Sequence, residues 1–173
     1  MEIGSSAVAG VFFWRSNTSH DCRGSFSKVI PSESKSALGS FELRDAFITE
    51  SHAGVIRGMH LQVDAFASAR IVHILEGEIN DVIIDLRKTS QSFREVHSLN
   101  LSSEGINTLL IPSNIAHGFE SVTKAKILYL SNKEHNPNFD TGFNPLTIGF
   151  NWMSEKPTIS DRDLNLPNFA RRE

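Results

Sequence analysis

The hydrophobic positions of this chain fall into short runs rather than long helical stripes. Apolar, largely β-branched runs occupy positions 46–48, 54–61, 70–75, 79–86, 96–101, 108–111, 118–122 and 127–130. They recur about every ten residues with turn residues between them, and no stretch keeps a 3.6-residue period. The pattern predicts an all-β sandwich or barrel, in which the mouth is the expected ligand site.

Two neighbouring runs carry the clearest local prediction. Residues 70–75 and 79–86 are separated by Glu76-Gly77-Glu78, which is typical of a β-hairpin. The second run is too continuously apolar for a strand with one solvated face, so we expect it in the centre of a sheet. Short helices are expected at 34–38 and after Ser160, and the polar tail from Asn151 is expected to pack over the barrel.

Composition and charge narrow the class of protein. The 173 residues are 39% hydrophobic, which suits one domain spanning 1–173 with a substantial core. The net charge of -3 gives no basic face for nucleic acid, and no apolar run approaches the roughly 20 residues of a membrane helix. Met1 to Trp14 lacks the basic start of a signal peptide, so we expect a cytoplasmic protein. Cys22 is the only cysteine, which excludes an internal disulfide.

Two histidines stand inside β patterns, His60 within 57–62 and His117 within 111–119. A buried imidazole costs desolvation energy, so each is either a satisfied core group or a working one. Arg57 lies three positions before His60, which would place the two on opposite faces of a strand. A β-bulge would bring them to the same face, and Gly58 is a suitable residue for it.

A general base suits such a histidine, because a carboxylate on its second nitrogen fixes the tautomer and raises basicity. The candidate carboxylates are Asp81, Asp85, Asp161 and Asp163. We expect a structural role for Asp81 and Asp85, which fall within a strand, whereas Asp163 could fold back over the mouth. The sequence alone does not choose among them.

The arginines and histidines could also form a pyrophosphate site or a metal site. The guanidinium groups of Arg23, Arg57 and Arg70 would suit a pyrophosphate, although any one of them could be a solvated surface residue. A metal site would find only two clear nitrogen ligands, His60 and His117, where a catalytic site generally needs three or more. We therefore expect no metal.

Four ordered segments resemble the dTDP-4-dehydrorhamnose 3,5-epimerase family. Asp21-Cys22-Arg23-Gly24-Ser25-Phe26 resembles D-x-R-G-x-F, and 54–62 resembles G-V-L-R-G-L-H-x-Q. Residues 77–87 resemble G-x-x-x-D-V-x-V-D-L-R, and 111–119 resemble I-P-x-x-x-A-H-G-F. Together these landmarks cover most of the chain.

The resemblance implies a cupin-type jelly roll (a double-stranded β-helix) with short peripheral helices. It implies that His60, with Asp163 as its partner, removes the proton beside the C4 ketone of a nucleotide-linked 4-keto-6-deoxy sugar, in the first place a dTDP sugar. Arg70 would stabilise the enolate. Substrate contacts would come from Arg23, Phe26, Arg57, Gln62 and His117. No cofactor or metal is implied. The resemblance also implies a homodimer, in which Arg23 reaches the nucleotide across the interface.

The chain also departs from the family pattern. The position of the family's general-acid tyrosine, two residues before a proline, is His135 here, and Tyr129 is expected inside a strand where it cannot substitute. Arg70 replaces a lysine, while Phe47 and Ser68 replace an asparagine and a glutamine. These changes favour inversion at one carbon or a different nucleotide sugar, with His135 or water as proton donor. The alternatives are a sugar-nucleotide isomerase or a non-catalytic binding protein on the same barrel, and a metal-dependent cupin enzyme.

Overall fold

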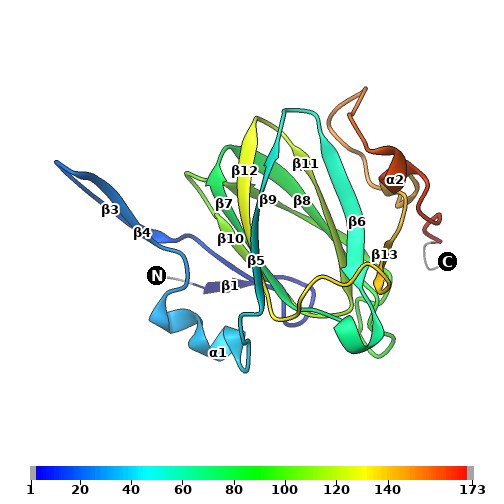
Figure 1. Cartoon of the computed structure of the whole chain (residues 1–173), viewed down its shortest axis with the longest axis horizontal. Coiled ribbons are helices and arrows are strands. Elements are labelled where there is room, and N and C mark those ends of the chain that lie inside the picture. Colours follow the sequence, from blue (N-terminus) through cyan, green and yellow to red (C-terminus); the bar gives the residue numbers. More distant parts are fainter. Residues whose placement is uncertain (1–2, 171–173) are drawn as a thin grey trace.

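Two antiparallel sheets face each other across the molecule in the computed structural model, which describes residues 3–170 (Figure 1). The six-stranded sheet has the order β1 (Ile3–Ser5), β2 (Phe12–Trp14), β10 (Thr108–Ile111), β7 (Arg70–Glu76), β12 (Ala125–Ser131) and β5 (Asp45–Ser51). The five-stranded sheet has the order β13 (Asp140–Gly142), β6 (Ile56–Gln62), β11 (Ile115–Ser121), β8 (Glu78–Asp85) and β9 (Val96–Ser102). This arrangement confirms the predicted jelly roll.

The main core fills the space between the two sheets. Inward residues of both sheets, among them Val72, Ile83, Phe119 and Ile127, are almost fully buried there. At one end of this interlayer the apolar filling gives way to polar side chains and a cavity. The barrel thus has an apolar interior and a polar mouth at this end.

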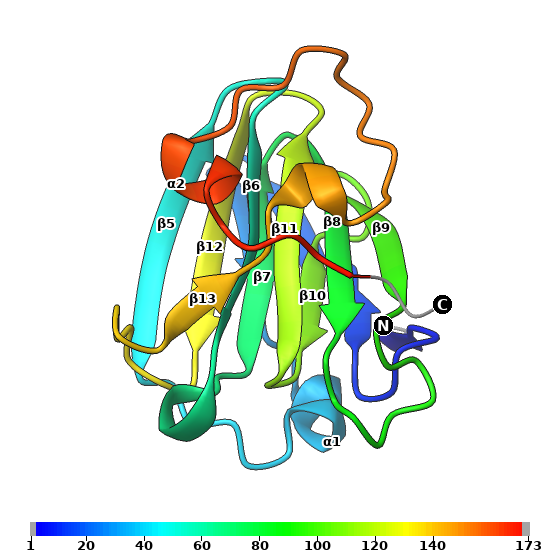
Figure 2. The same cartoon turned by 90° about the vertical axis from the view of Figure 1, so that its right-hand side faces the viewer.

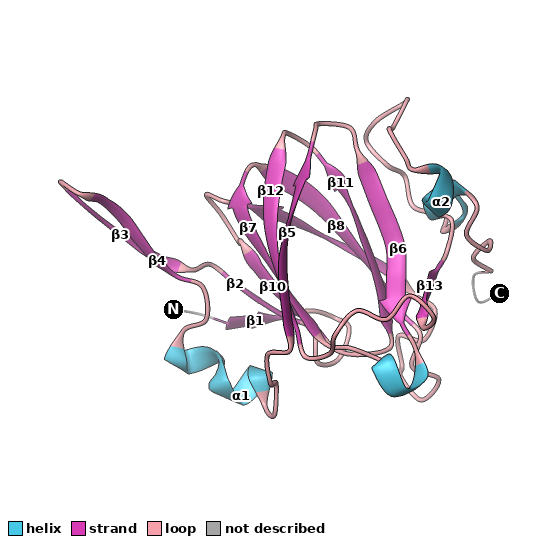
Figure 3. Cartoon of the chain, in the orientation of Figure 1, coloured by secondary structure: helices cyan, strands magenta, loops and turns pink. Residues whose placement is uncertain are grey.

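The peripheral elements are short. They are the helices α1 (Lys35–Leu38) and α2 (Asp161–Leu164) and three 3-10 turns at Ser32–Ser34, Asp64–Phe66 and Pro145–Thr147, seen in Figure 3. Both helices lie where the sequence predicted them. No helix within residues 3–170 is long and apolar enough to cross a bilayer.

The predicted hairpin between β7 and β8 is wrong. Strand β7 pairs with β10 and β12, whereas β8 pairs with β11 and β9 in the opposite sheet. The intervening Gly77 has φ +83°, and a Cβ there would collide with the carbonyl oxygen of Lys124. The turn is therefore a corner that carries the chain from one sheet to the other. The central position expected for 79–86 is confirmed, since β8 has neighbours on both sides.

Strands β1, β2 and β13 and an N-terminal hairpin were not predicted. The hairpin, β3 (Asn17–Asp21) and β4 (Gly24–Lys28), extends away from the barrel, and every residue in both strands is exposed (Figure 1). A two-stranded hairpin with no covering layer is at best marginally stable in water. We call this element the arm.

The C-terminal segment packs across the outer face of the five-stranded sheet, as expected (Figure 2). A second apolar cluster, including Met59, Ile84, Ile148 and Phe169, lies beneath it. The buried Glu120 carboxylate accepts hydrogen bonds from the backbone N–H groups of Met153 and Ser154, at 2.7 and 2.6 Å. These contacts hold the segment around Met153 and Ser154, which leads to α2 at the mouth of the barrel.

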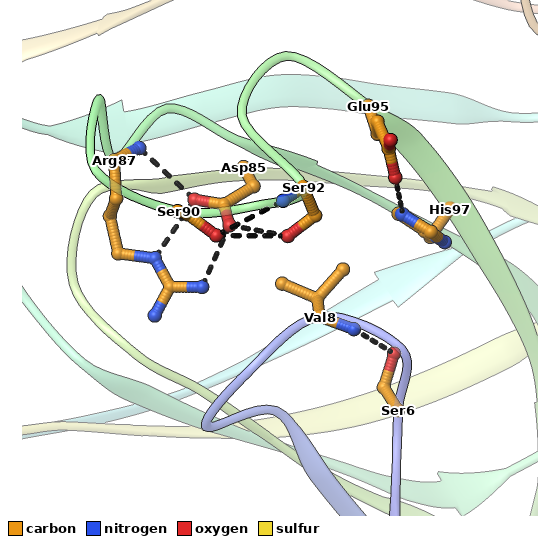
Figure 4. Close-up of polar contacts among 8 residues, drawn as sticks. All are labelled: Ser6, Val8, Asp85, Arg87, Ser90, Ser92, Glu95 and His97. Carbon is orange, nitrogen blue, oxygen red and sulfur yellow. Dashed lines mark hydrogen bonds and ion pairs between the residues drawn. The ribbon is translucent and has the colours of Figure 1, made fainter.

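Asp85 at the end of β8 has the structural role expected from its sequence position (Figure 4). Its buried carboxylate accepts two side-chain hydrogen bonds from Arg87 and one from Ser92, each at 2.8 Å. Burial alone would raise the pKa of Asp85, but the bonds from Arg87, Ser90 and Ser92 outweigh burial and lower it well below its usual value. The ionised carboxylate therefore stabilises the fold.

Asp85→Asn is expected to lower the free energy of unfolding at pH 7 by about 3 kcal/mol, because it leaves Arg87 without its anion. Since folding depresses the pKa, this stabilisation is complete above the unfolded pKa near 4 and is lost as pH falls below it. Urea denaturation at pH 7 and at successively lower pH measures the gap between the unfolding free energies of the wild-type protein and Asp85→Asn. The exposed Glu104→Gln serves as the control. A gap that stays constant down to pH 3 would contradict the assignment.

Candidate active site

A two-lobed cavity opens at the mouth of the barrel between β5, β12 and β7 on one side and β6 on the other. We call its two parts the recognition lobe, about 450 Å³, and the base lobe, about 230 Å³. Both are lined by Phe47, His60, Arg70 and Tyr129. The recognition lobe adds Asp45, Gln62, Ser68, Ser131, Lys133, His135 and Asp140. The base lobe adds Thr49, Arg57, His117, Phe119, Ser160, Arg162 and Asp163.

The bulge predicted at Gly58 is present. Where β6 pairs with β11, His117 lies opposite His60 and Phe119 lies opposite Arg57, so β6 has one extra residue. Gly58 has φ +130°, and a Cβ there would lie only 2.5 Å from the Cα of Gly118. Glycine is therefore required at this point. The bulge brings Arg57 and His60 to the same side, and both line the base lobe.

His60 is paired with Asp163, the carboxylate that the resemblance indicated. His60 Nε2 lies 2.7 Å from Asp163 Oδ1, and the backbone N–H of Gly58 donates to Asp163 Oδ2 at 3.2 Å. The Ser160 side chain caps α2 by accepting from the Asp163 N–H. Burial would raise the pKa of Asp163, but the hydrogen bonds from His60 and Gly58 and the charge of Arg162 outweigh burial and lower it. The ionised carboxylate holds the Nε2–H tautomer, which leaves the lone pair of His60 on Nδ1.

A second histidine–carboxylate pair stands beside the first. His117 Nε2 lies 2.6 Å from Asp81 Oδ2, and both side chains are at most 4% exposed. Asp81 lines neither lobe, so it can act on the site only through His117. The register accounts for this contact, because Asp81 pairs with Phe119 and is a diagonal neighbour of His117 on the same side of the sheet. Pairing register cannot be read from one strand alone.

Two arginine side chains line the cavity without a carboxylate partner among the described residues. Arg57 donates to Ser51 Oγ at 2.9 Å and to the Glu50 carbonyl at 3.2 Å. Arg70 makes one long contact, 3.5 Å to Ser68 Oγ, and burial lowers its pKa, which the nearby Tyr129, Asp140 and Asp81 oppose. A desolvated guanidinium with unused N–H groups is suited to bind an anion or a developing negative charge.

Tyr129 lines the cavity, which was not expected from its position inside a strand. Its ring is 6% exposed, lines both lobes together with His60 and Arg70, and stacks on Phe47 at a centroid separation of 4.9 Å. Burial raises the pKa of Tyr129, an effect that Asp81 strengthens and Arg70 opposes. The phenol therefore stays protonated at neutral pH and can donate a hydrogen bond. The sequence located Tyr129 correctly within a strand, but its inward face follows from the pairing of β12 with β5.

His135 and Gln62 lie at the recognition lobe in different ways. His135 is an exposed residue at the rim of this lobe. Gln62 is buried, and its amide bonds the main chain on either side of His135, donating to the Glu134 carbonyl at 3.1 Å and accepting from the Asn136 N–H at 2.6 Å. Gln62 thus holds the loop that carries His135.

Arg23 and Phe26 are not brought to the cavity of their own chain. Both lie on the arm, where the Arg23 side chain is 86% exposed and Phe26 is 67% exposed. Arg23 contacts the Asp21 carboxylate at 2.5 Å. Among residues 3–170 there is also no group of three His, Cys, Asp or Glu side chains arranged to hold a metal ion.

Comparison with known proteins agrees with this geometry. The family model described as dTDP-4-dehydrorhamnose 3,5-epimerase matches residues 5–171. A dTDP-4-dehydrorhamnose 3,5-epimerase of Shigella flexneri is 32% identical over 131 residues, 72% of each chain. A Sinorhizobium fredii enzyme of the same name is 28% identical over 98% of this chain and 90% of its own.

A solved structure extends the likeness to three dimensions. The Bacillus anthracis dTDP-4-dehydrorhamnose 3,5-epimerase, crystallised with TDP and PPi bound, superposes with a TM-score of 0.88 at 26% identity, covering 97% of this chain and 99% of that one. The family match, the shared fold and the His60–Asp163 pair at the barrel mouth agree. The chain described here belongs to the dTDP-4-dehydrorhamnose 3,5-epimerase family.

Proposed function

We propose that this chain, as one jelly-roll domain, is a cytoplasmic epimerase of a nucleotide-linked 4-keto-6-deoxy sugar in deoxysugar biosynthesis. The observation that carries the proposal is the His60–Asp163 pair, 2.7 Å apart, in a cavity that also holds Arg70, His117 and Tyr129. These groups supply a base, cations or hydrogen-bond donors for an oxyanion, and an acid. Epimerisation beside a ketone is redox-neutral, so these side chains suffice for the chemistry.

The first step is proton abstraction. His60 Nδ1 takes the proton from C3 or C5, and the electron pair of the broken C–H bond moves into the ring to form an enolate with its charge on the C4 oxygen. Asp163 stabilises the imidazolium that forms. Arg70 lies where it can stabilise the enolate oxygen in a largely desolvated site, and His117 lines the sugar pocket.

The second step is reprotonation from the opposite face. Tyr129 donates its phenolic proton to the same carbon, the C4 carbonyl re-forms, and the configuration is inverted. Tyr129, rather than His135, is the proposed donor because it lines both lobes together with His60, whereas His135 lines only the recognition lobe, at its exposed rim. His60 and Tyr129 then exchange protons with solvent, which restores the starting states.

Turnover of dTDP-4-keto-6-deoxyglucose tests the proposal. The proton spectrum of the product should contain a new set of ring coupling constants, which identify the inverted centre. Calorimetry that detects nucleotide-sugar binding without any turnover would instead favour the non-catalytic alternative. The bound TDP of the Bacillus anthracis relative supports dTDP as the first nucleotide to try.

The arm supports a homodimer as part of this proposal. If Arg23 and Phe26 contact the nucleotide, they must reach the cavity of a second copy, because the arm that carries them extends away from the barrel of its own chain (Figure 1). The outer face of the six-stranded sheet also exposes Ile48 and Leu75. A second subunit would cover both surfaces.

We expect a solution mass of about twice 19.2 kDa by light scattering. Arg23→Ala should raise KM at least about tenfold with little change in kcat, since the guanidinium would contribute binding alone. Mixing Arg23→Ala with the inactive His60→Asn should restore low-KM activity, because each mixed dimer joins an intact arm to an intact base. A monomeric mass, or no restoration on mixing, would contradict the dimer.

A further inference from the structure

The arm is attached to the six-stranded sheet at both of its ends. Where the chain enters β3, the backbone N–H of Ser16 donates to Asn107 Oδ1 at 2.9 Å. Where the chain leaves β4, the indole N–H of Trp14 donates to the Val29 carbonyl at 2.9 Å. Ser16, Asn107 and Trp14 are each at most 5% exposed, whereas every residue of the two arm strands is exposed. We call these two contacts the root of the arm.

Asn107 is itself held by a chain of buried hydrogen bonds. Its Oδ1 also accepts from the Thr108 hydroxyl at 3.0 Å, and Thr108 Oγ1 lies 2.8 Å from His73 Nδ1. Because the single hydroxyl proton of Thr108 goes to Asn107, the His73 ring donates to Thr108 through Nδ1–H. Burial lowers the pKa of His73, although a hydrogen bond with the Asn107 backbone opposes this, so the ring is neutral at pH 7. The arm is therefore anchored on an acceptor whose position is fixed.

The length of the arm amplifies any change of direction at its root. Strand β3 has five residues, so at about 3.4 Å per residue its far end lies about 17 Å from the root. A rotation of about 15° at the root would move that end by roughly 4 Å. Since a hydrogen bond to a guanidinium is lost over a smaller shift, Arg23 can bind a nucleotide well only if the root holds the direction of the arm.

We propose that Asn107 is a positioning residue for the nucleotide site of the second subunit. It acts through the N–H of Ser16, by fixing the direction in which the arm carries Arg23 and Phe26. An arm that is already directed binds without the entropy cost of being ordered. This inference rests on the proposed epimerase dimer. It adds a residue that lines neither lobe of the cavity and yet controls the affinity of the partner's site for the substrate.

Asn107→Ala should raise KM for dTDP-4-keto-6-deoxyglucose at least about fivefold with little change in kcat, because the arm contributes binding alone. Asn107→Asp keeps an oxygen acceptor for both donors and should return KM to near the wild-type value. Trp14→Phe removes the second root hydrogen bond and should raise KM in the same way, which tests the root independently of Asn107. Asn100→Ala, an exposed asparagine on β9 in the other sheet, is the control and should leave KM unaltered.

Mixing variants shows which subunit the defect affects. Asn107→Ala combined with the inactive His60→Asn should recover low-KM activity, because the mixed dimer joins an intact arm to an intact base. A defect confined to the variant's own cavity would not be repaired in this way. The same mixture therefore distinguishes loss of arm direction from general damage to the fold.

The outcomes separate this inference from the function on which it rests. If Arg23→Ala raises KM but Asn107→Ala and Trp14→Phe do not, the inference is overturned and the epimerase dimer stands. A raised KM in Asn107→Ala that mixing with His60→Asn fails to lower would also overturn it. If Arg23→Ala itself leaves KM unchanged, the arm does not bind the nucleotide, and that part of the proposed function is overturned together with this inference.

Discussion

His60→Asn is expected to lower kcat/KM for epimerisation by roughly 10²–10⁴-fold, the range that general-base catalysis contributes. The amide keeps the approximate shape of the ring but has no nitrogen that can take a proton. Because His60 is only partly buried and the Asp163 carboxylate keeps the Gly58 hydrogen bond, the fold should persist. Initial rates of product formation, followed by NMR, measure the loss.

His52→Asn is a matched control for His60→Asn. His52 lies in the exposed turn between β5 and β6 and lines neither lobe, so His52→Asn should retain wild-type activity. Asp163→Asn should have a kcat/KM between those of the wild-type protein and His60→Asn, because the imidazole stays in place but loses the anion that stabilises its protonated form. Full activity in His60→Asn would remove the base from the proposed mechanism.

Tyr129→Phe is expected to separate proton exchange from inversion of configuration, which the wild-type protein couples. Without the phenolic proton, formation of the inverted product should fall roughly 10²–10⁴-fold. His60 can still remove a proton and, after exchange with deuterium oxide, return a deuteron to the same face. The substrate should therefore gain deuterium with retention of configuration, which a paired measurement of isotope content and product detects.

His135→Ala is the comparison that assigns the acid. If Tyr129 donates the proton, this rim variant should lose no more than a few-fold in the rate of inversion. The opposite result, with Tyr129→Phe active and His135→Ala unable to invert, would make His135 the donor. That outcome would restore the assignment that follows from the sequence motif alone.

Local sequence patterns predicted the features that depend on local geometry. The bulge at Gly58, the central place of 79–86 and the two short helices follow from residue type and spacing within one segment. The family segments correctly led to Asp163 as the partner of His60. The arm was missed because its polar residues lack the alternation that a half-buried strand shows.

Features that depend on pairing between distant strands were not accessible. The contact of Asp81 with His117 depends on the register of β8 with β11, and the place of Tyr129 in the cavity depends on the register of β12 with β5. The turn at Gly77 has the composition of a hairpin, yet it connects opposite sheets, since residue type does not specify where the next strand pairs.

The most direct test of the central claim is solvent deuterium exchange into dTDP-4-keto-6-deoxyglucose, followed by proton NMR with the wild-type protein and His60→Asn side by side. If His60 is the base, the wild-type protein should remove the C3 signal, the C5 signal or both, with matching epimer formation, and His60→Asn should leave both signals intact. Equal exchange by the two proteins would contradict the account, because another group would then be removing the proton.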